Sequence, residues 1–141
     1  MYISIMIDCL IIGDSIAVGT KMMRPDCVAV AKGGINSSQW RRQYLDGDQG
    51  ALPRAETLII SLGSNDHKGV NTREEISRIR STITAKRVYW IMPAIKPEIQ
   101  DIVREVAAGF GDTVIPITRL QPDGVHPSWA GYKEIAEKTK I

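Results

Sequence analysis

The sequence predicts a three-layer α/β/α sandwich built on a five-stranded parallel sheet. Five short apolar runs of strand length alternate along the chain with segments that have the spacing of helices. Strands that alternate with helices form parallel sheets covered on both faces, and we expect a flavodoxin-like strand order. The chain has 141 residues and no linker, repeat or low-complexity segment. Residues 1–141 are therefore expected to form a single α/β domain.

The first strand organises the rest of the chain. Residues 5–12 are apolar apart from Asp8, and Gly13 ends the run before a small polar turn. Such a run is typical of a buried parallel strand that feeds a helix. Ser15 therefore stands at the carboxyl end of a central strand, the edge at which open α/β sheets bind ligands.

The other elements follow from similar signals. In chain order we expect a helix over 16–23, a strand over 27–31, a short helix over 40–45, a turn over 46–50, a strand over 57–62, a helix from Thr72, a strand over 87–92, a helix over 97–110, a strand over 113–117 and a final helix from Ser128. Thr72 and Glu75 match a capping box. Pro97 suits the first position of a helix, and Pro116 inside the last strand places that strand at a sheet edge.

The composition excludes several classes of protein. The 18 basic and 16 acidic residues give a net charge of +2 without long runs of either sign, so we expect no nucleic-acid partner. No stretch reaches the roughly 18 uncharged apolar residues of a membrane helix. The apolar N-terminus has no leading Lys or Arg and is interrupted by Asp8, which disfavours a signal peptide. We expect a cytoplasmic protein with no membrane partner, in which Cys9 and Cys27 are buried free thiols.

Residues with chemical capacity follow four of the predicted strands. They are Ser15, the Gly33-Gly34 pair, Asn65, and the two residues Asp123 and His126. Parallel topology brings these loops to one edge of the sheet, so we expect one site. A serine becomes a good nucleophile when a neutral imidazole takes its proton, and a carboxylate commonly orients that imidazole. N–H groups of Ser15 and of a loop glycine, with the Asn65 amide, would supply an oxyanion hole.

Three blocks of the chain resemble those of the SGNH (GDSL-type) hydrolase superfamily. Gly13-Asp14-Ser15-Ile16 is similar to the first block of that superfamily, with Ile16 in the place of its usual leucine. Gly63-Ser64-Asn65-Asp66 is similar to its G-x-N-D block, and Asp123-Gly124-Val125-His126-Pro127 to its D-x-x-H-P block. Each block is short, but three in the same order, each following a predicted strand, form a specific pattern.

The resemblance implies an esterase with Ser15 as nucleophile, His126 as base and Asp123 as the partner of that base. The oxyanion hole that it implies consists of Ser15, Gly34 and Asn65, and Gly33 is the alternative to Gly34. The sequence identifies no substrate-binding residue. No cluster of residues has metal-ligand spacing and no glycine pattern matches a nucleotide-binding loop, so neither a metal nor a cofactor is expected.

The expected reaction is hydrolysis of a carboxylic ester through an acyl-serine intermediate. The loops are short and leave no room for a lid domain, so the site is expected to be open and shallow. This favours a small acyl group such as acetyl, carried by a small molecule or a carbohydrate. Two alternatives stay open: an acyltransferase, and a carbohydrate-binding module that has lost turnover.

Several other polar and aromatic residues are expected to be structural. Asp14 and Asp66 are expected to fix loops by accepting hydrogen bonds from backbone N–H groups. His67 is expected to be an exposed loop residue, with a place at the rim of the site as the alternative. The three tryptophans, Trp40, Trp90 and Trp129, are expected to be packing residues, although Trp129 is close enough to His126 in sequence to wall the site.

Overall fold

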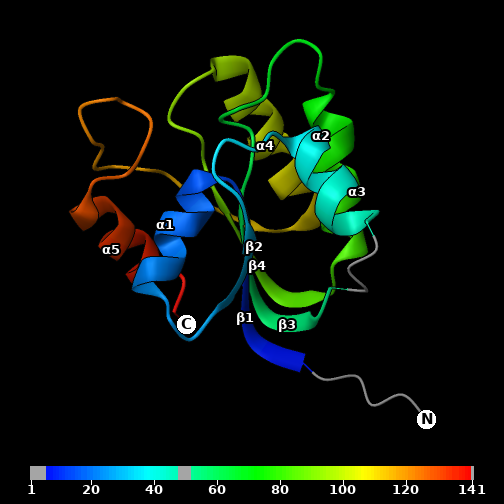
Figure 1. Ribbon diagram of the computed structural model, residues 1–141, viewed down its shortest axis with the longest axis horizontal. Coiled ribbons are helices and arrows are strands. Elements are labelled where there is room, and N and C mark those ends of the chain that lie inside the picture. Colours follow the sequence, from blue (N-terminus) through cyan, green and yellow to red (C-terminus); the bar gives the residue numbers. More distant parts are fainter. Residues whose placement is uncertain (1–5, 48–51, 141) are drawn as a thin grey trace.

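A parallel sheet forms the centre of the protein (Figure 1). The computed structural model describes residues 6–47 and 52–140. The strands are β1 (Met6–Gly13), β2 (Val28–Ala31), β3 (Arg54–Ser61), β4 (Ala85–Ile91) and β5 (Thr113–Ile115). All neighbouring strands pair in parallel in the order β2-β1-β3-β4-β5. The predicted five-stranded sheet and its flavodoxin-like order are confirmed, and the strands share one carboxyl edge, at the top of Figure 1.

Helices cover both faces of this sheet. They are α1 (Ser15–Met23), α2 (Ser37–Trp40), the π-helix η1 (Arg41–Leu45), α3 (Thr72–Thr82), α4 (Pro97–Phe110) and α5 (Trp129–Lys138). In Figure 1, α1 and α5 lie on one side of the sheet and α2, α3 and α4 on the other. Strand residues alternate between the two layers: Leu10 and Ile12 pack with α3 and α4, whereas Ile11 packs with α1 and α5. The predicted α/β/α sandwich is therefore confirmed.

The helical segment predicted over 40–45 begins earlier than the apolar pattern indicates. Asn36 caps α2, because its side chain accepts a hydrogen bond from the N–H of Gln39 while the Gln39 side chain accepts one from the N–H of Asn36. This reciprocal pair starts the helix at Ser37. The chain then widens into η1, a form often found near functional sites.

The capping box predicted for Thr72 and Glu75 is wrong. Asn71 is the N-cap of α3, and its side chain accepts from the N–H of Glu74. Both Thr72 and Glu75 are buried and have tertiary partners instead: the hydroxyl of Thr72 donates to Asp66, and the carboxylate of Glu75 accepts from Arg41.

β5 is shorter than the strand predicted over 113–117. It ends at Ile115, before Pro116, which has no N–H to donate to the sheet. Its position at the edge of the sheet is as predicted. Residue 5, the first of the predicted strand 5–12, and residues 48–50 of the predicted turn 46–50 lie outside the described residues.

The prediction of free thiols is wrong. Cys9 in β1 and Cys27, the residue before β2, form a disulfide bond, and their Cα atoms are 4.5 Å apart. The register pairs Leu10 with Val28, so the residue before each of them stands opposite the other. The local pattern around each cysteine indicates only a buried position, whereas the bond depends on which strands are neighbours.

None of the helices in residues 6–47 and 52–140 is long and apolar enough to cross a membrane. The cytoplasmic location stays a prediction.

Candidate active site

Ser15, His126 and Asp123 form a hydrogen-bonded chain at the carboxyl edge of the sheet. The Oγ of Ser15 lies 2.8 Å from Nε2 of His126. The Nδ1 of the same ring lies 2.7 Å from Oδ2 of Asp123. With its proton on Nδ1, the imidazole donates to the carboxylate, and its unprotonated Nε2 accepts from the serine hydroxyl. The structure therefore brings the three predicted triad residues together in the order that proton transfer requires.

The turn between β1 and α1 holds Ser15 in place. Gly13 has a φ of 136°, and a Cβ on this residue would lie 1.8 Å from the carbonyl oxygen of Ser61. Only glycine therefore permits β1 to end so close to β3. Ser15 is the first residue of α1, so its N–H is among the N–H groups that have no acceptor within the helix.

Asp14 is the N-cap of α1 and is fully buried. Its Oδ1 accepts from the N–H of Ile16 and from the hydroxyl of Ser61, both at 3.0 Å. These bonds confirm the predicted role of Asp14 in fixing the turn. Within the described residues, its Oδ2 has no hydrogen-bond partner. Burial raises the pKa of Asp14 from 3.8 to about 6, because the ionised carboxylate loses its hydration.

Asp123 and His126 belong to one loop, between β5 and α5. The Oδ1 of Asp123 accepts from the backbone N–H groups of Val125 and His126, at 2.9 and 3.0 Å. These two bonds, followed by the bond to the His126 ring, lower the pKa of Asp123 from 3.8 to about 2. The carboxylate is therefore ionised at neutral and mildly acidic pH.

Apart from Ser15, the predicted oxyanion donors follow the two strands that flank β1. Asn65 follows β3, and its side-chain amide donates to the carbonyl oxygen of Ile35, in the loop after β2, at 3.0 Å. The amide carries two N–H bonds, so one anchors the side chain and the other remains for a ligand. A Cβ on Gly33 would lie 3.9 Å from the Cβ of Ser15, whereas a Cβ on Gly34 would meet no atom within 4 Å. Gly33 therefore lies beside Ser15, and a donor role for Gly34 stays a prediction.

Asp66 connects the loop that carries Asn65 to two helices. Its carboxylate accepts from the N–H and the hydroxyl of Ser37, both at 2.8 Å, and from the hydroxyl of Thr72 at 2.7 Å. The predicted structural role of this buried residue is confirmed. The two hydroxyl donors come from α2 and α3, and the sequence did not identify them.

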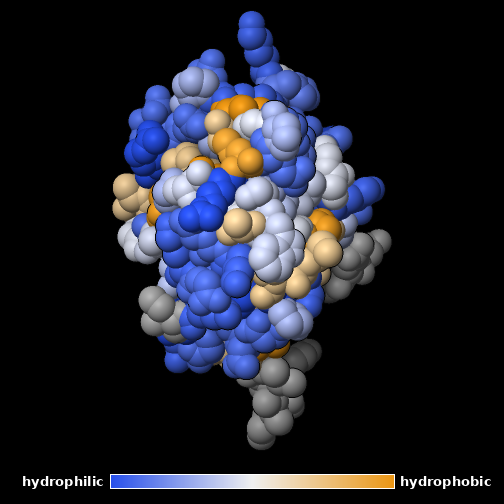
Figure 2. Space-filling model, turned by 90° about the vertical axis from the view of Figure 1, so that its left-hand side faces the viewer, coloured by the Kyte–Doolittle hydropathy of each residue, from blue (hydrophilic) through white to orange (hydrophobic). Residues whose placement is uncertain are grey.

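His67 and two of the three tryptophans lie as predicted, and Trp129 does not. His67 is an exposed loop residue, as predicted, and its Nδ1 accepts from the N–H of Gly69. Trp40 and Trp90 are buried, but the packing role predicted for Trp129 is wrong, because 69% of it is exposed. Trp129 lines an apolar cavity of about 370 Å³ with Met22 and other residues of α1 and α5. Figure 2 shows the side with these helices, where small hydrophobic areas are separated by hydrophilic side chains.

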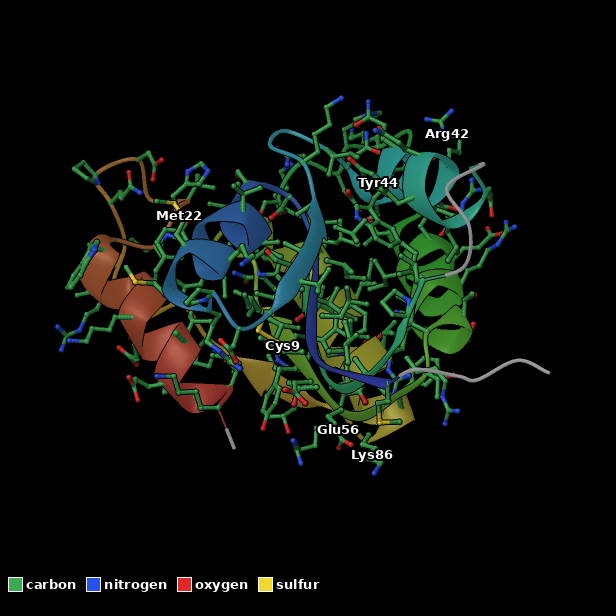
Figure 3. All side chains as sticks on the ribbon, turned by 60° about the horizontal axis from the view of Figure 1, so that its bottom comes forward. Cys9, Met22, Arg42, Tyr44, Glu56 and Lys86 are labelled. Atoms are coloured by element: carbon green, nitrogen blue, oxygen red, sulfur yellow. A yellow bond between two sulfur atoms is a disulfide. The ribbon has the colours of Figure 1, made fainter. Side chains whose placement is uncertain are left out.

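Two cavities adjoin the loops that carry the predicted oxyanion donors. A polar cavity of about 230 Å³ is lined by Lys32, Gly33, Gly34, Ile35, Gln39 and Gln43. A larger and mainly apolar cavity of about 630 Å³ lies between the loop 66–72 and the start of α4. Gln43 comes from η1, which is marked in Figure 3 by the labels of Arg42 and Tyr44. Among the described residues, no group of three or more His, Cys, Asp or Glu side chains is arranged to hold a metal ion.

No protein-family model matches this chain, and no curated protein matches its sequence. Its similarity to solved structures is extensive. The lipase/acylhydrolase from Enterococcus faecalis superposes with a TM-score of 0.67 and 18% identity, over 93% of this chain and 92% of that chain. The chain has the SGNH hydrolase fold. The resemblance seen in the three sequence blocks is thus confirmed at the level of the fold.

Two further structures with this fold differ in the reaction that their names describe. One is the C-terminal catalytic domain of a peptidoglycan O-acetyltransferase from Streptococcus pneumoniae, with a TM-score of 0.62 and 20% identity over 94% of this chain and 90% of that chain. The other is an acetyl xylan esterase from Butyrivibrio proteoclasticus, with a TM-score of 0.57 and 10% identity over 98% of this chain and 63% of that chain.

Proposed function

We propose that this SGNH-fold protein is a serine esterase that hydrolyses carboxylic esters through an acyl-Ser15 intermediate. The observation that carries the proposal is the chain of hydrogen bonds from Ser15 through His126 to Asp123, with distances of 2.8 and 2.7 Å. A structural serine at a helix start needs no imidazole, and an imidazole paired only for stability needs no serine. General-base catalysis requires both contacts.

The geometry supports a two-step reaction. As Oγ of Ser15 attacks the ester carbonyl, its proton moves to Nε2 of His126, and Asp123 stabilises the imidazolium. The oxyanion is stabilised by the Ser15 N–H, a loop glycine N–H and the Asn65 amide. His126 then protonates the leaving alcohol, which leaves an acyl group on Ser15. In the second step His126 takes a proton from water, the hydroxide attacks the acyl carbonyl, and the proton returns to Ser15 as the acid departs.

For the substrate we propose a small acyl group, such as acetyl, on a carbohydrate alcohol. The polar cavity beside Gly33 supports this choice, because Gln39, Gln43 and Lys32 offer amide and ammonium groups to hydroxyls. Two structures with the same fold also support it, because one is named an acetyl xylan esterase and the other a peptidoglycan O-acetyltransferase.

The O-acetyltransferase neighbour also supports a second candidate function, acyl transfer, in which a sugar hydroxyl replaces water in the second step. The two functions differ in what added acceptor does. Both release the alcohol of the ester, but an acyltransferase then forms an acylated acceptor when an oligosaccharide is added, whereas an esterase releases the acyl group as free acid.

The experiment that tests the proposal measures covalent labelling of Ser15 by an organophosphorus serine probe, with peptide mapping to locate the adduct. We expect one adduct, on Ser15, and at least a hundredfold slower labelling in His126→Ala. Two matched controls are His67→Ala, which removes the other histidine, and Ser81→Ala, which removes an exposed serine of α3. Both controls should label like the wild type.

Hydrolysis of 4-nitrophenyl esters with two to twelve acyl carbons then tests the substrate. We expect the highest kcat/KM for the acetyl ester, and release of acetate from acetylated xylo- or chito-oligosaccharides. A folded wild-type protein that neither labels nor hydrolyses any of these esters would refute the enzyme, and would leave a carbohydrate-binding module. A rate that increases toward long acyl chains would refute the small-acyl substrate alone.

A further inference from the structure

Lys96 stands out in the backbone geometry of the protein. Among residues 6–47 and 52–140 it is the one non-glycine residue with a positive φ, which is 64°. Its Cβ makes this conformation unfavourable, so surrounding contacts must hold it there. Lys96 is the N-cap of α4, but its side chain makes no capping hydrogen bond to the helix. The side chain turns instead to the loop that carries Asn65.

The ammonium group of Lys96 bridges the two residues that flank Asn65. Its Nζ donates to the carbonyl oxygen of Ser64 at 2.8 Å and to that of Asp66 at 2.7 Å. Lys96 makes both contacts from a left-handed backbone position at the start of α4. An ammonium has three N–H donors and no acceptor, so it can bind two carbonyl oxygens together.

We propose that Lys96 is a positioning residue that holds Asn65 in the orientation needed to donate to the substrate oxyanion. It fixes the backbone on both sides of Asn65, so that the side-chain amide leaves the loop in one direction. The proposal rests on the proposed function, because it assigns Lys96 a role through the oxyanion donor. It adds a residue that lies outside all three blocks of the resemblance.

The loop 63–66 also contacts α4, the loop after β2, and helices α2 and α3. Lys96 supplies the contact from the start of α4 to the two carbonyl groups beside Asn65. A Cβ on Gly63 would lie 2.8 Å from Cγ2 of Ile99 in α4, so the loop lies directly against the start of that helix. The amide of Asn65 bonds to the carbonyl oxygen of Ile35, and the carboxylate of Asp66 is bound by α2 and α3. Without Lys96, the two carbonyl groups beside Asn65 would lose their shared donor on the α4 side.

Three variants separate positioning from a purely structural role. Lys96→Met removes the charge and keeps the aliphatic chain. Lys96→Gly removes the side chain but suits a φ of 64°, so its backbone is relaxed. The matched control is Lys86→Met, near the amino end of β4, where Lys86 pairs with Glu56 at 3.4 Å on the opposite edge of the sheet (Figure 3). All three are compared with wild type by thermal unfolding before any other measurement.

The first readout is steady-state kinetics with 4-nitrophenyl acetate, repeated in an Asn65→Ala background. We expect both Lys96 variants to lower kcat by 10- to 100-fold with KM within twofold of wild type, and Lys86→Met to change neither. If Lys96 acts through Asn65, it has nothing to position once the amide is absent. Lys96→Met should therefore lower kcat by less than twofold in the Asn65→Ala background. An equal loss in both backgrounds would overturn the proposal.

The second readout does not depend on turnover. The side-chain amide of Asn65 gives a pair of ¹H–¹⁵N signals, assigned by their loss in Asn65→Ala. We expect both Lys96 variants to shift these signals and to increase their exchange with solvent at least tenfold, while Lys86→Met leaves them unchanged. Unchanged Asn65 signals in Lys96→Gly would refute positioning, even if activity falls. If wild-type Ser15 fails to label, the proposed function is refuted, and these signals still decide whether Lys96 positions Asn65.

Discussion

The disulfide bond between Cys9 and Cys27 gives a prediction that can be worked out from the fold. The cross-link joins residues 18 positions apart. It removes loop-closure entropy from the unfolded chain, and for a loop of this length the chain-entropy relation gives about 3 kcal/mol of stabilisation. For a domain of this size each kcal/mol shifts Tm by roughly 3 °C, so loss of the bond should lower Tm by about 10 °C.

The assays are urea unfolding, which gives the unfolding free energy, and a thermal melt, which gives Tm. Both are followed by tryptophan fluorescence, since Trp40 and Trp90 are buried. Wild type in oxidising buffer is compared with wild type in excess dithiothreitol and with a Cys9→Ala/Cys27→Ala double variant. We expect the last two to unfold at similar, lower urea concentrations. Their rate of Ser15 labelling at 25 °C should stay within twofold of wild type, because Cys9 lies six residues before Ser15, toward the opposite end of β1.

The result that refutes this reasoning is an equal unfolding midpoint in all three samples, together with two titratable thiols in unreduced wild type. The same measurement bears on location. Disulfides are rare in the reducing cytoplasm. If the bond contributes about 3 kcal/mol, a cytoplasmic form of the protein would lack that stabilisation.

Three further predictions concern buried or ionised carboxylates. Because the folded-state pKa of Asp14 is raised from 3.8 to about 6, its protonated form stabilises the fold below pH 4, and this contribution is lost as the pH rises through 6. Relative to Asp14→Asn, wild type should lose about 2 kcal/mol of unfolding free energy between pH 4 and pH 7, and a constant difference would contradict this. Asp66→Ala leaves the buried donors of Ser37 and Thr72 without their acceptor, which should lower the urea-derived unfolding free energy by about 3 kcal/mol or more; a loss below about 1 kcal/mol would show that water replaces the carboxylate. Asp123→Asn should lower kcat toward 4-nitrophenyl acetate by roughly 10²- to 10⁴-fold without changing Tm, and a variant within tenfold of wild type would remove Asp123 from the triad.

Much of the fold could be predicted because its signals are local. Apolar runs and helical spacing determine the order of the elements, and the blocks around Ser15, Asn65 and His126 each follow a strand. Parallel topology then requires these residues to meet at one edge. The prediction of their meeting needed no knowledge of side-chain contacts.

The predictions that were wrong concern residues whose partners lie far away in the sequence. Cys9 and Cys27 form a bond because of the β1–β2 register. The hydroxyl of Thr72 donates to Asp66, which leaves Asn71 to cap α3. Trp129 lies six residues before the buried Ile135, which places it about 120° away around α5 and toward solvent.

Lys96 is the clearest example of a residue whose role could not be predicted from local sequence. A lysine before a helix-starting proline is ordinary in sequence, and no local pattern predicts a left-handed backbone at that position. Its side chain binds two carbonyl groups about 30 residues earlier in the chain, and these contacts appear only in the folded structure. A search for charged residues near the three blocks in sequence would not find it.

The base and its carboxylate occupy a single loop, so they change position together when that loop changes over evolution. The carboxylate of Asp123 binds the imidazole of His126 and also the backbone N–H groups of Val125 and His126. The pair therefore forms one unit that is held together by bonds within the loop. Among the described residues, the one hydrogen bond between this unit and the nucleophile is the 2.8 Å contact to Ser15. Insertions on either side of residues 123–126 would therefore shift the whole unit, and could separate a folded binding protein from an active enzyme without altering any of the three residues.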